Sequence, residues 1–243
     1  MRWMPGKKRI LPACLAVLAA ASPALAHGNV SDRIAILGDR IKSHPGIAAL
    51  YAERAELLRQ HGEFDAALAD WGAAEKRDPR LAPDPCVRAQ LLLEAKAPQK
   101  ALPLLAALVK KDPKDGLAWF LLGQAHAGAG DRAAACAAFD TAIPLLNPLL
   151  PDQVLVQAGA HLADSHPEQA LDRLEAGMRR LGSLVVLQEQ AVDIEVGLGR
   201  TPAALARLDA VIADFKARKL RPDAWVRRKE QIMAGPTRPP STR

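Results

Sequence analysis

Alanine recurs at five positions and proline at four positions along the chain, in each series at intervals of 34 or 35 residues. Such a period is typical of a solenoid, in which each repeat is one supersecondary unit that buries its apolar face only against its neighbours. The sequence therefore predicts a repeat array whose function lies on an extended surface and not in the cleft of a globular domain. The recurring residues are Ala67, Ala101, Ala135, Ala170 and Ala204, and Pro45, Pro79, Pro113 and Pro148.

The third copy of the repeat carries the clearest pattern. Its residues are Trp119, Leu122, Gly123, His126, Ala135, Phe139 and Pro148. This order resembles the tetratricopeptide repeat, W-x2-L-G-x2-Y followed by A-x3-F and P. The resemblance implies an all-α fold, a solenoid of helical hairpins that forms an α-α superhelix. The first copy departs only by conservative replacements, with Tyr51, Arg54, Ala55, Leu58, Ala67, Trp71 and Pro79.

Small residues in this pattern have a physical reason that does not depend on the family. An alanine or glycine where two antiparallel helices cross lets them approach closely, so we expect Gly123 at such a contact. Gly159 is expected to face the groove instead. Gly62 and Gly130 are expected to take the left-handed conformation at helix C-termini, and a proline then closes the unit because it cannot continue a helix.

The other copies are weaker, and no alternating β-branched run competes with the helical interpretation. In the second copy Ala97-Pro98 stands where a glycine turn is expected. In the fifth, Ala191 to Gly199 is one residue longer than Ala55 to Gly62, which predicts a one-residue insertion in that turn. The expected organisation is a signal peptide in 1–26, an N-terminal half-repeat helix in 27–45, about five repeats in 46–221, a capping helix in 222–235 and a disordered tail in 236–243.

Residues 1–26 have the order of a cleavable secretory signal. A basic start is followed by an apolar stretch over 10–21 and by the small-x-small sequence Ala24-Leu25-Ala26. We therefore expect cleavage after Ala26 and a periplasmic or secreted protein without stable membrane insertion. Two alternatives are a lipoprotein signal at Cys14, which almost no apolar stretch precedes, and an uncleaved anchor, for which the stretch is short against the about 20 residues of a span.

The charge distribution argues against a nucleic-acid partner. The chain is +6, but four of its 33 basic and none of its 27 acidic residues lie in 1–26, which leaves +2. Residues 216–243 hold nine basic and two acidic side chains, so the body, 27–215, is at −5. A nucleic-acid binder needs Lys and Arg clustered along its working face. The basic end is interpreted either as a solvated capping helix or as a dock for an acidic partner or anionic lipid.

The histidines give only weak indications of a metal site. His126 and His161 share the slot where the repeat pattern has Tyr, and we interpret them as interior aromatic replacements. His161, Asp164 and His166 form a poor ligand pattern, because His166 falls on a loop. After signal cleavage, an N-terminal His27 would offer its amine and imidazole together to Cu(II).

The rest of the sequence offers no catalytic signature. No nucleophile-elbow, Walker-type or zinc-protease motif is present. Cys86 and Cys136 are expected on helices that are not adjacent, so we interpret them as thiols and not as a disulfide. We therefore expect a protein with no enzymatic activity and no cofactor.

The resemblance implies where a partner binds. In tetratricopeptide proteins the groove is lined by the second, fifth, ninth, twelfth and thirteenth residues of each repeat, mostly from the first helix. The lining carried over to this chain is apolar with scattered amides and suits an extended or helical peptide segment. Phe120 is its only large aromatic residue, although Phe120 and Leu155 are alternatively core residues. The lining comprises Ala52, Glu56, Arg59, Cys86, Gln90, Leu93, Leu117, Phe120, Gln124, Ala127, Leu155, Gly159, Leu162, Gln188, Val192 and Glu195.

The sequence thus predicts an exported, non-catalytic adaptor or scaffold of the bacterial periplasm or cell envelope. It is expected to bind a peptide segment of another protein in its concave groove. The alternative is a small-molecule or copper-binding accessory protein that acts through His27.

Overall fold

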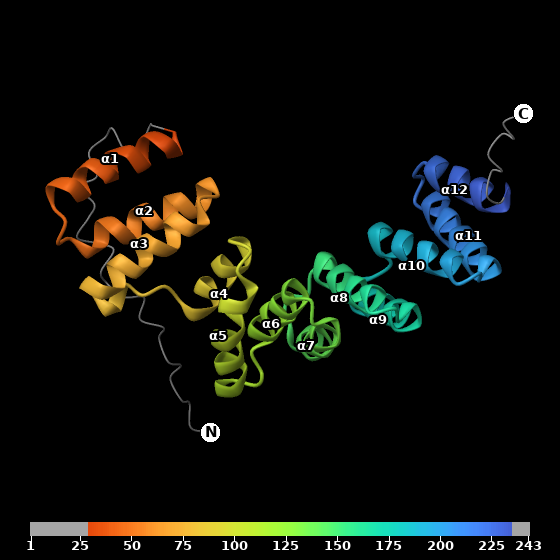
Figure 1. Cartoon of the computed structure of the whole chain (residues 1–243). Coiled ribbons are helices and arrows are strands. Elements are labelled where there is room, and N and C mark those ends of the chain that lie inside the picture. Colours follow the sequence, from red (N-terminus) through yellow and green to blue (C-terminus); the bar gives the residue numbers. More distant parts are fainter. Residues whose placement is uncertain (1–28, 235–243) are drawn as a thin grey trace, which may run out of the picture. The chain divides into compact units, whose positions relative to one another are not determined.

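The computed structural model describes residues 29–234, and every regular element among them is a helix (Figure 1). The predicted signal peptide, His27 and the predicted tail at 236–243 lie outside these residues. The chain divides into two compact units between Asp84 and Pro85. The predicted all-α fold is confirmed.

The first unit contains one helix followed by a helical hairpin. Helix α1 packs on α2, and α2 pairs with α3. Arg54 on α2 donates two hydrogen bonds to the Asp70 carboxylate on α3, at 2.6 and 2.8 Å, and so fastens the hairpin beside its apolar core. The elements are α1 (Val30–Ser43), α2 (Ala48–His61), α3 (Phe64–Arg77) and the short 3-10 helix η3 (Pro79–Leu81).

The second unit contains four further hairpins and a final helix. In each hairpin the two helices pack against each other, and first helices also meet, α4 with α6 and α8 with α10. The hairpins are α4 (Pro85–Glu94) with α5 (Pro98–Lys111), α6 (Gly116–Ala129) with α7 (Arg132–Leu145), α8 (Pro151–Ala163) with α9 (Pro167–Leu181), and α10 (Val185–Gly197) with α11 (Thr201–Ala217), and the final helix is α12 (Asp223–Ala234).

Close helix crossings occur where the side chain is smallest. A Cβ atom at Gly123 would lie 2.6 Å from Cδ1 of the Phe139 ring on the partner helix, well inside van der Waals contact. Gly177 on α9 leaves the same kind of room for Val154 on α8. A Cβ at Gly159 would meet nothing within 4 Å. The contact expected at Gly123 is therefore confirmed, and the space around Gly159 leaves room for a side chain.

The turn inside each hairpin has the same backbone conformation. One residue per turn has a positive φ, which is the left-handed region that favours glycine. The second and fourth turns reach it without glycine, so Ala97-Pro98 does not mark a different kind of turn. The five residues are spaced by 34, 34, 35 and 34: Gly62 (84°), Lys96 (57°), Gly130 (87°), Ser165 (62°) and Gly199 (70°).

Candidate protein-binding surface

One backbone hydrogen bond recurs at the end of each first helix and identifies equivalent residues in the five repeats. A backbone carbonyl there accepts from the amide five residues further on. In the third repeat Asp131 N donates to His126 O at 3.0 Å, and in the fifth Arg200 N donates to Glu195 O at 2.8 Å. The equivalent residues of the five repeats are therefore Leu58, Leu92, His126, His161 and Glu195.

This register corrects the prediction for the fifth repeat. Glu195 occupies the slot of His126 and His161 and not a groove position, and no residue is inserted in the turn. Val192, not Ala191, matches Ala55, because seven residues separate Val192 from Gly199 as they separate Ala55 from Gly62. The sequence prediction failed here because a larger residue fills a slot that is small in the other copies.

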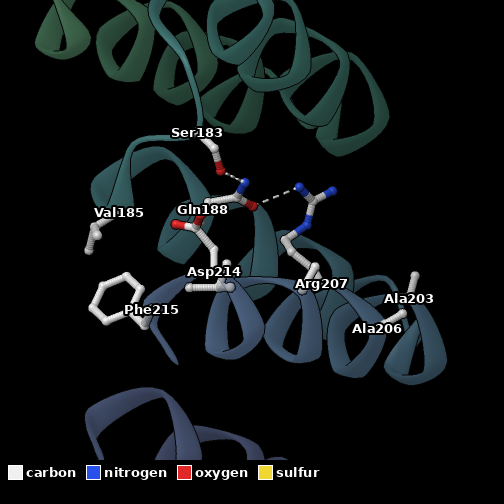
Figure 2. Close-up of a pocket in the computed structure, with 10 residues that line it drawn as sticks. Ser183, Val185, Gln188, Ala203, Ala206, Arg207, Asp214 and Phe215 are labelled. Carbon is white, nitrogen blue, oxygen red and sulfur yellow. Dashed lines mark hydrogen bonds between the residues drawn. The ribbon is translucent and has the colours of Figure 1, made fainter. Parts of the chain in front are cut away.

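The residues predicted for the groove in the fifth repeat accordingly pack inward. Val192 and Glu195 are 1% and 5% exposed. Gln188 is half-buried, donates to Ser183 Oγ at 2.7 Å and accepts from Arg207 at 2.9 Å, so it faces α11 (Figure 2). The exposed residues at the corresponding groove positions are Val186, Glu189, Asp193 and Val196.

Three predicted groove residues belong to α2 in the first unit. Ala52, Glu56 and Arg59 are all half-buried. Arg59 donates to both carboxylate oxygens of Glu56, at 2.7 and 3.0 Å, and this hydrogen bonding lowers the pKa of Glu56. The charges of Arg59 and Glu56 thus largely neutralise each other within α2.

The remaining predicted residues lie on first helices of the second unit. Gln90 is exposed and donates to Glu94 at 3.0 Å. Leu93 and Gln124 are half-buried, and Leu155 is half-buried against the main core. Together with the equivalent positions of the other repeats they form a surface that we call the first-helix face. It comprises Gln90, Leu93, Leu117, Gln124, Ala127, Asp152, Leu155, Gly159, Leu162, Val186, Glu189, Asp193 and Val196.

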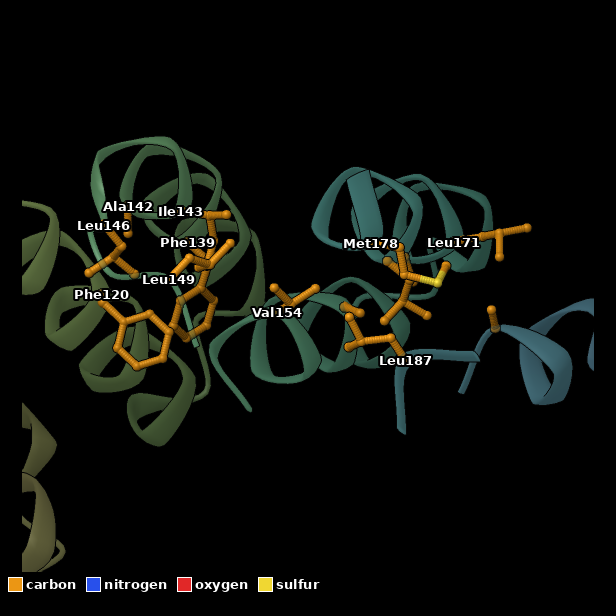
Figure 3. Packing of buried hydrophobic residues seen from close by; sticks show 14 of the residues in the cluster. Phe120, Phe139, Ala142, Ile143, Leu146, Leu149, Val154, Leu171, Met178 and Leu187 are labelled. Atoms are coloured by element: carbon orange, nitrogen blue, oxygen red, sulfur yellow. The ribbon is translucent and has the colours of Figure 1, made fainter. Parts of the chain in front are cut away.

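Phe120 is a core residue, which corrects its prediction as an aromatic anchor of the groove. It is 7% exposed, and its ring centroid lies 5.3 Å from that of Phe139. Figure 3 shows the two rings side by side in the buried cluster that continues toward Val154. The missing side chain at Gly123 lets Phe139 approach α6, and Phe120 packs on the ring from the same helix. The first-helix face therefore consists of aliphatic, amide and acidic groups.

A pocket lies at the C-terminal end of the first-helix face, between α10 and α12. Its volume is about 440 Å³. Glu189 and Asp193 line it from α10, and Arg227 and Arg228 line it from α12. Buried Trp225 adds apolar surface. The final helix thus contributes to this surface as well as covering the core of the last hairpin.

A second pocket, of about 420 Å³, lies between the start of α10 and α11 (Figure 2). Arg207 lies at its edge and is held by Glu195 through two hydrogen bonds of 2.8 and 3.1 Å, and by Glu175 on α9. The bond to Glu195 is the main cause of a raised Arg207 pKa, against the opposing effect of burial. Because this guanidinium is already paired on two sides, we assign it to the packing of successive repeats.

A matching polar cluster joins the third and fourth repeats. The Asp140 carboxylate on α7 accepts from Gln157 at 2.6 Å and His161 at 2.9 Å on α8, and from Arg173 on α9 at 2.7 and 2.9 Å. Burial acts to raise the pKa of Asp140, but these hydrogen bonds outweigh it and the pKa is lowered. Neither cluster was predicted from the sequence. The available signal was a pair of acid-to-arginine spacings, Asp140 to Arg173 and Glu175 to Arg207.

The histidines and cysteines form no metal site among residues 29–234. His161 is 2% exposed and turned toward Asp140, whereas His166 lies 3.3 Å from Asp164. Cys136 is buried on α7, which raises the pKa of its thiol, and Cys86 is half-buried on α4. The copper site proposed for His27 stays a prediction, because His27 lies outside the described residues. Within the described part of the chain, no helix is both long and apolar enough to span a membrane.

Comparison with known proteins agrees with this architecture. Residues 86–149 match the family model described as tetratricopeptide repeat. No curated protein matches the chain.

Solved structures show the same fold at low sequence identity. MamA from Desulfovibrio magneticus RS-1, from residue 41 to its end, is 20% identical with a TM-score of 0.53, over 64% of this chain and 88% of that one. A tetratricopeptide repeat protein from Parabacteroides merdae ATCC 43184 is 17% identical with a TM-score of 0.56, over 78% of this chain and 75% of that one. The family model over residues 86–149 and five hairpins that share one turn conformation show that the chain contains tetratricopeptide repeats and has the fold of a tetratricopeptide solenoid.

Proposed function

We propose that the protein is a non-catalytic scaffold that binds a segment of another protein on the first-helix face of its second unit. The observation that carries this proposal is a set of exposed apolar side chains at two repeat positions of the first helices α6 and α10. Leu117, Val186 and Val196 are 48%, 46% and 36% exposed. Exposed apolar groups that gather on one surface and are bordered by polar ones are typical of protein-interaction sites.

The polar groups of this face suit a peptide backbone. Gln124 on α6 is half-buried, and its amide has no hydrogen-bond partner among the described residues. An amide both donates and accepts, so Gln124 can bind a main-chain N–H or C=O of an extended or helical segment. Half-buried Leu93, Leu155 and Leu162 supply apolar contacts on either side.

The experiment compares capture of envelope proteins by the purified protein and by two double variants. Leu117→Ser with Val196→Ser removes apolar surface from the first-helix face. Leu145→Ser with Leu220→Ser makes the same chemical change at residues that are 37% and 52% exposed elsewhere. We expect the face variant to retain less than about a fifth of the bound partner, since interface energy concentrates in few side chains. Equal retention by both variants would refute the proposal.

We further propose that the protein acts in the periplasm or at the cell envelope. The support is the basic, apolar and small-x-small order of residues 1–26. Mass spectrometry of protein made in a Gram-negative host should give a chain that begins at His27. An intact Met1, or a lipid on Cys14, would contradict export by this route.

A further inference from the structure

Basic residues are distributed unevenly between the helices of the second unit. Helices α6, α8 and α10 contain no lysine or arginine, and α4 contains only Arg88, which is not part of the first-helix face, whereas α5, α7, α9 and α11 each contain at least one basic residue. The charged side chains of the first-helix face are therefore all acidic: Asp152, Glu189 and Asp193. An apolar face with only negative charge is complementary to an apolar segment that carries positive charge.

Two of these carboxylates are available to a partner. Asp152 and Glu189 are exposed, and neither forms an ion pair or side-chain hydrogen bond with another described residue. Asp193 binds the guanidinium of Arg228 on α12 at 2.5 Å, between side chains that are 55% and 44% exposed. This pair demonstrates that the acidic side of α10 holds a guanidinium.

The pocket between α10 and α12 gives the positive charge a defined place. Its volume of about 440 Å³ accommodates a long side chain, with the aliphatic stem against Val192 and Trp225 and the charged end at Glu189. Within the pocket Arg228 is neutralised by Asp193, whereas Glu189 and Arg227 form no ion pair among the described residues, so the carboxylate of Glu189 is the group that a basic side chain can bind there.

We propose that the segment bound on the first-helix face is apolar and basic, and that Asp152 and Glu189 bind its lysine or arginine side chains. The proposal rests on the function proposed for that face and names the chemical class of its partner. An acidic segment with the same apolar residues is repelled by the same carboxylates, so the face discriminates by charge.

The test uses fluorescence anisotropy with the purified protein and two labelled peptides of ~12 residues. Both peptides have the same leucine and valine residues, and their polar positions are all lysine in one and all glutamate in the other. We expect the lysine peptide to bind at least about tenfold more tightly at roughly 50 mM salt, and the difference to shrink at high salt as charges are screened.

A charge-matched pair of variants locates the effect. Asp152→Asn with Glu189→Gln neutralises the face, and Asp65→Asn with Asp172→Asn removes the same charge from other exposed positions. Asp65 matches Asp152 because each lies in the first turn of its helix. We expect the first variant to lose at least about fivefold in affinity for the lysine peptide and the second to lose little.

Each outcome separates this inference from the function on which it rests. Equal losses in the two variants, or equal binding of the two peptides, would overturn the preference for basic segments. The two peptides could bind the purified protein equally well. If the Leu117→Ser and Val196→Ser variant then binds neither of them, the face remains a binding surface. If neither peptide binds, the inference fails, and the capture experiment decides the proposed function independently.

Discussion

Arg173 on α9 binds Asp140 on α7 through two hydrogen bonds, and both helices are second helices of consecutive repeats. One repeat later, Arg207 on α11 binds Glu175 on α9 through one hydrogen bond. In each case the helix between them adds a hydrogen-bond partner, His161 on α8 and Glu195 on α10. These two clusters join three successive repeats through polar groups that flank an apolar core.

The first prediction concerns pH. The pKa of Asp140 is lowered in the folded state, so its charge stabilises the fold at pH values above its unfolded pKa of about 3.9, and this contribution is lost as pH falls through the folded pKa. Asp140→Asn should lower the free energy of unfolding at pH 7 by about 1–3 kcal/mol. It should also make that free energy depend less steeply on pH below about 4.

Urea unfolding at several pH values measures both effects. Asp172→Asn is the control, because Asp172 is exposed and forms no ion pair among the described residues. The account of the cluster fails if Asp140→Asn and Asp172→Asn change stability equally at pH 7 and leave the same acid slope.

The second prediction compares two glycines on first helices. Gly123→Ala should destabilise by about 1–3 kcal/mol, because its Cβ would collide with the buried Phe139 ring. Gly159→Ala meets open space and should stabilise by up to about 1 kcal/mol through helix propensity. Thermal unfolding followed by circular dichroism measures the difference, and equal melting temperatures would show that the helix contact is assigned wrongly.

The third prediction concerns the turn between α4 and α5. Lys96 has a φ of 57°, which costs an L-residue about 1 kcal/mol. Lys96→Gly should therefore stabilise the protein by several tenths of a kcal/mol, net of the greater freedom of glycine in the unfolded chain. Ala106→Gly, exposed in the middle of α5, is the control and should destabilise by about 0.5–1 kcal/mol. A loss of stability in both variants would contradict the argument from turn conformation.

The helical architecture was predictable because its signals are local and repeated. Gly62 and Gly130 predicted two turns, and the absence of a side chain at Gly123 predicted a close helix contact. The fifth repeat was misjudged because Ala191, a residue of the expected size, stands next to Val192, which occupies the slot. A shift of one residue turns a helix by about 100°, and so Gln188 moved from the predicted groove to the contact with α11.

The candidate surface was predictable only in part. Repeat positions located Gln90, Leu93 and Leu155 on the first helices. They did not predict the burial of Phe120, which depends on how closely the Phe139 ring on α7 approaches α6. The Asp140 cluster was missed because its members come from three helices, and no single-helix pattern brings them together.

Site-specific photo-cross-linking tests the central claim most directly. A photoreactive amino acid replaces exposed Leu117 or Val196 on the first-helix face, or, as controls, exposed Ala106 on α5 or Leu220 after α11. The account predicts that, in cells, cross-links to a partner protein form from positions 117 and 196 and that positions 106 and 220 give few or none. Cross-links that form mainly from 106 or 220 would contradict the assignment of the first-helix face as the protein-binding surface.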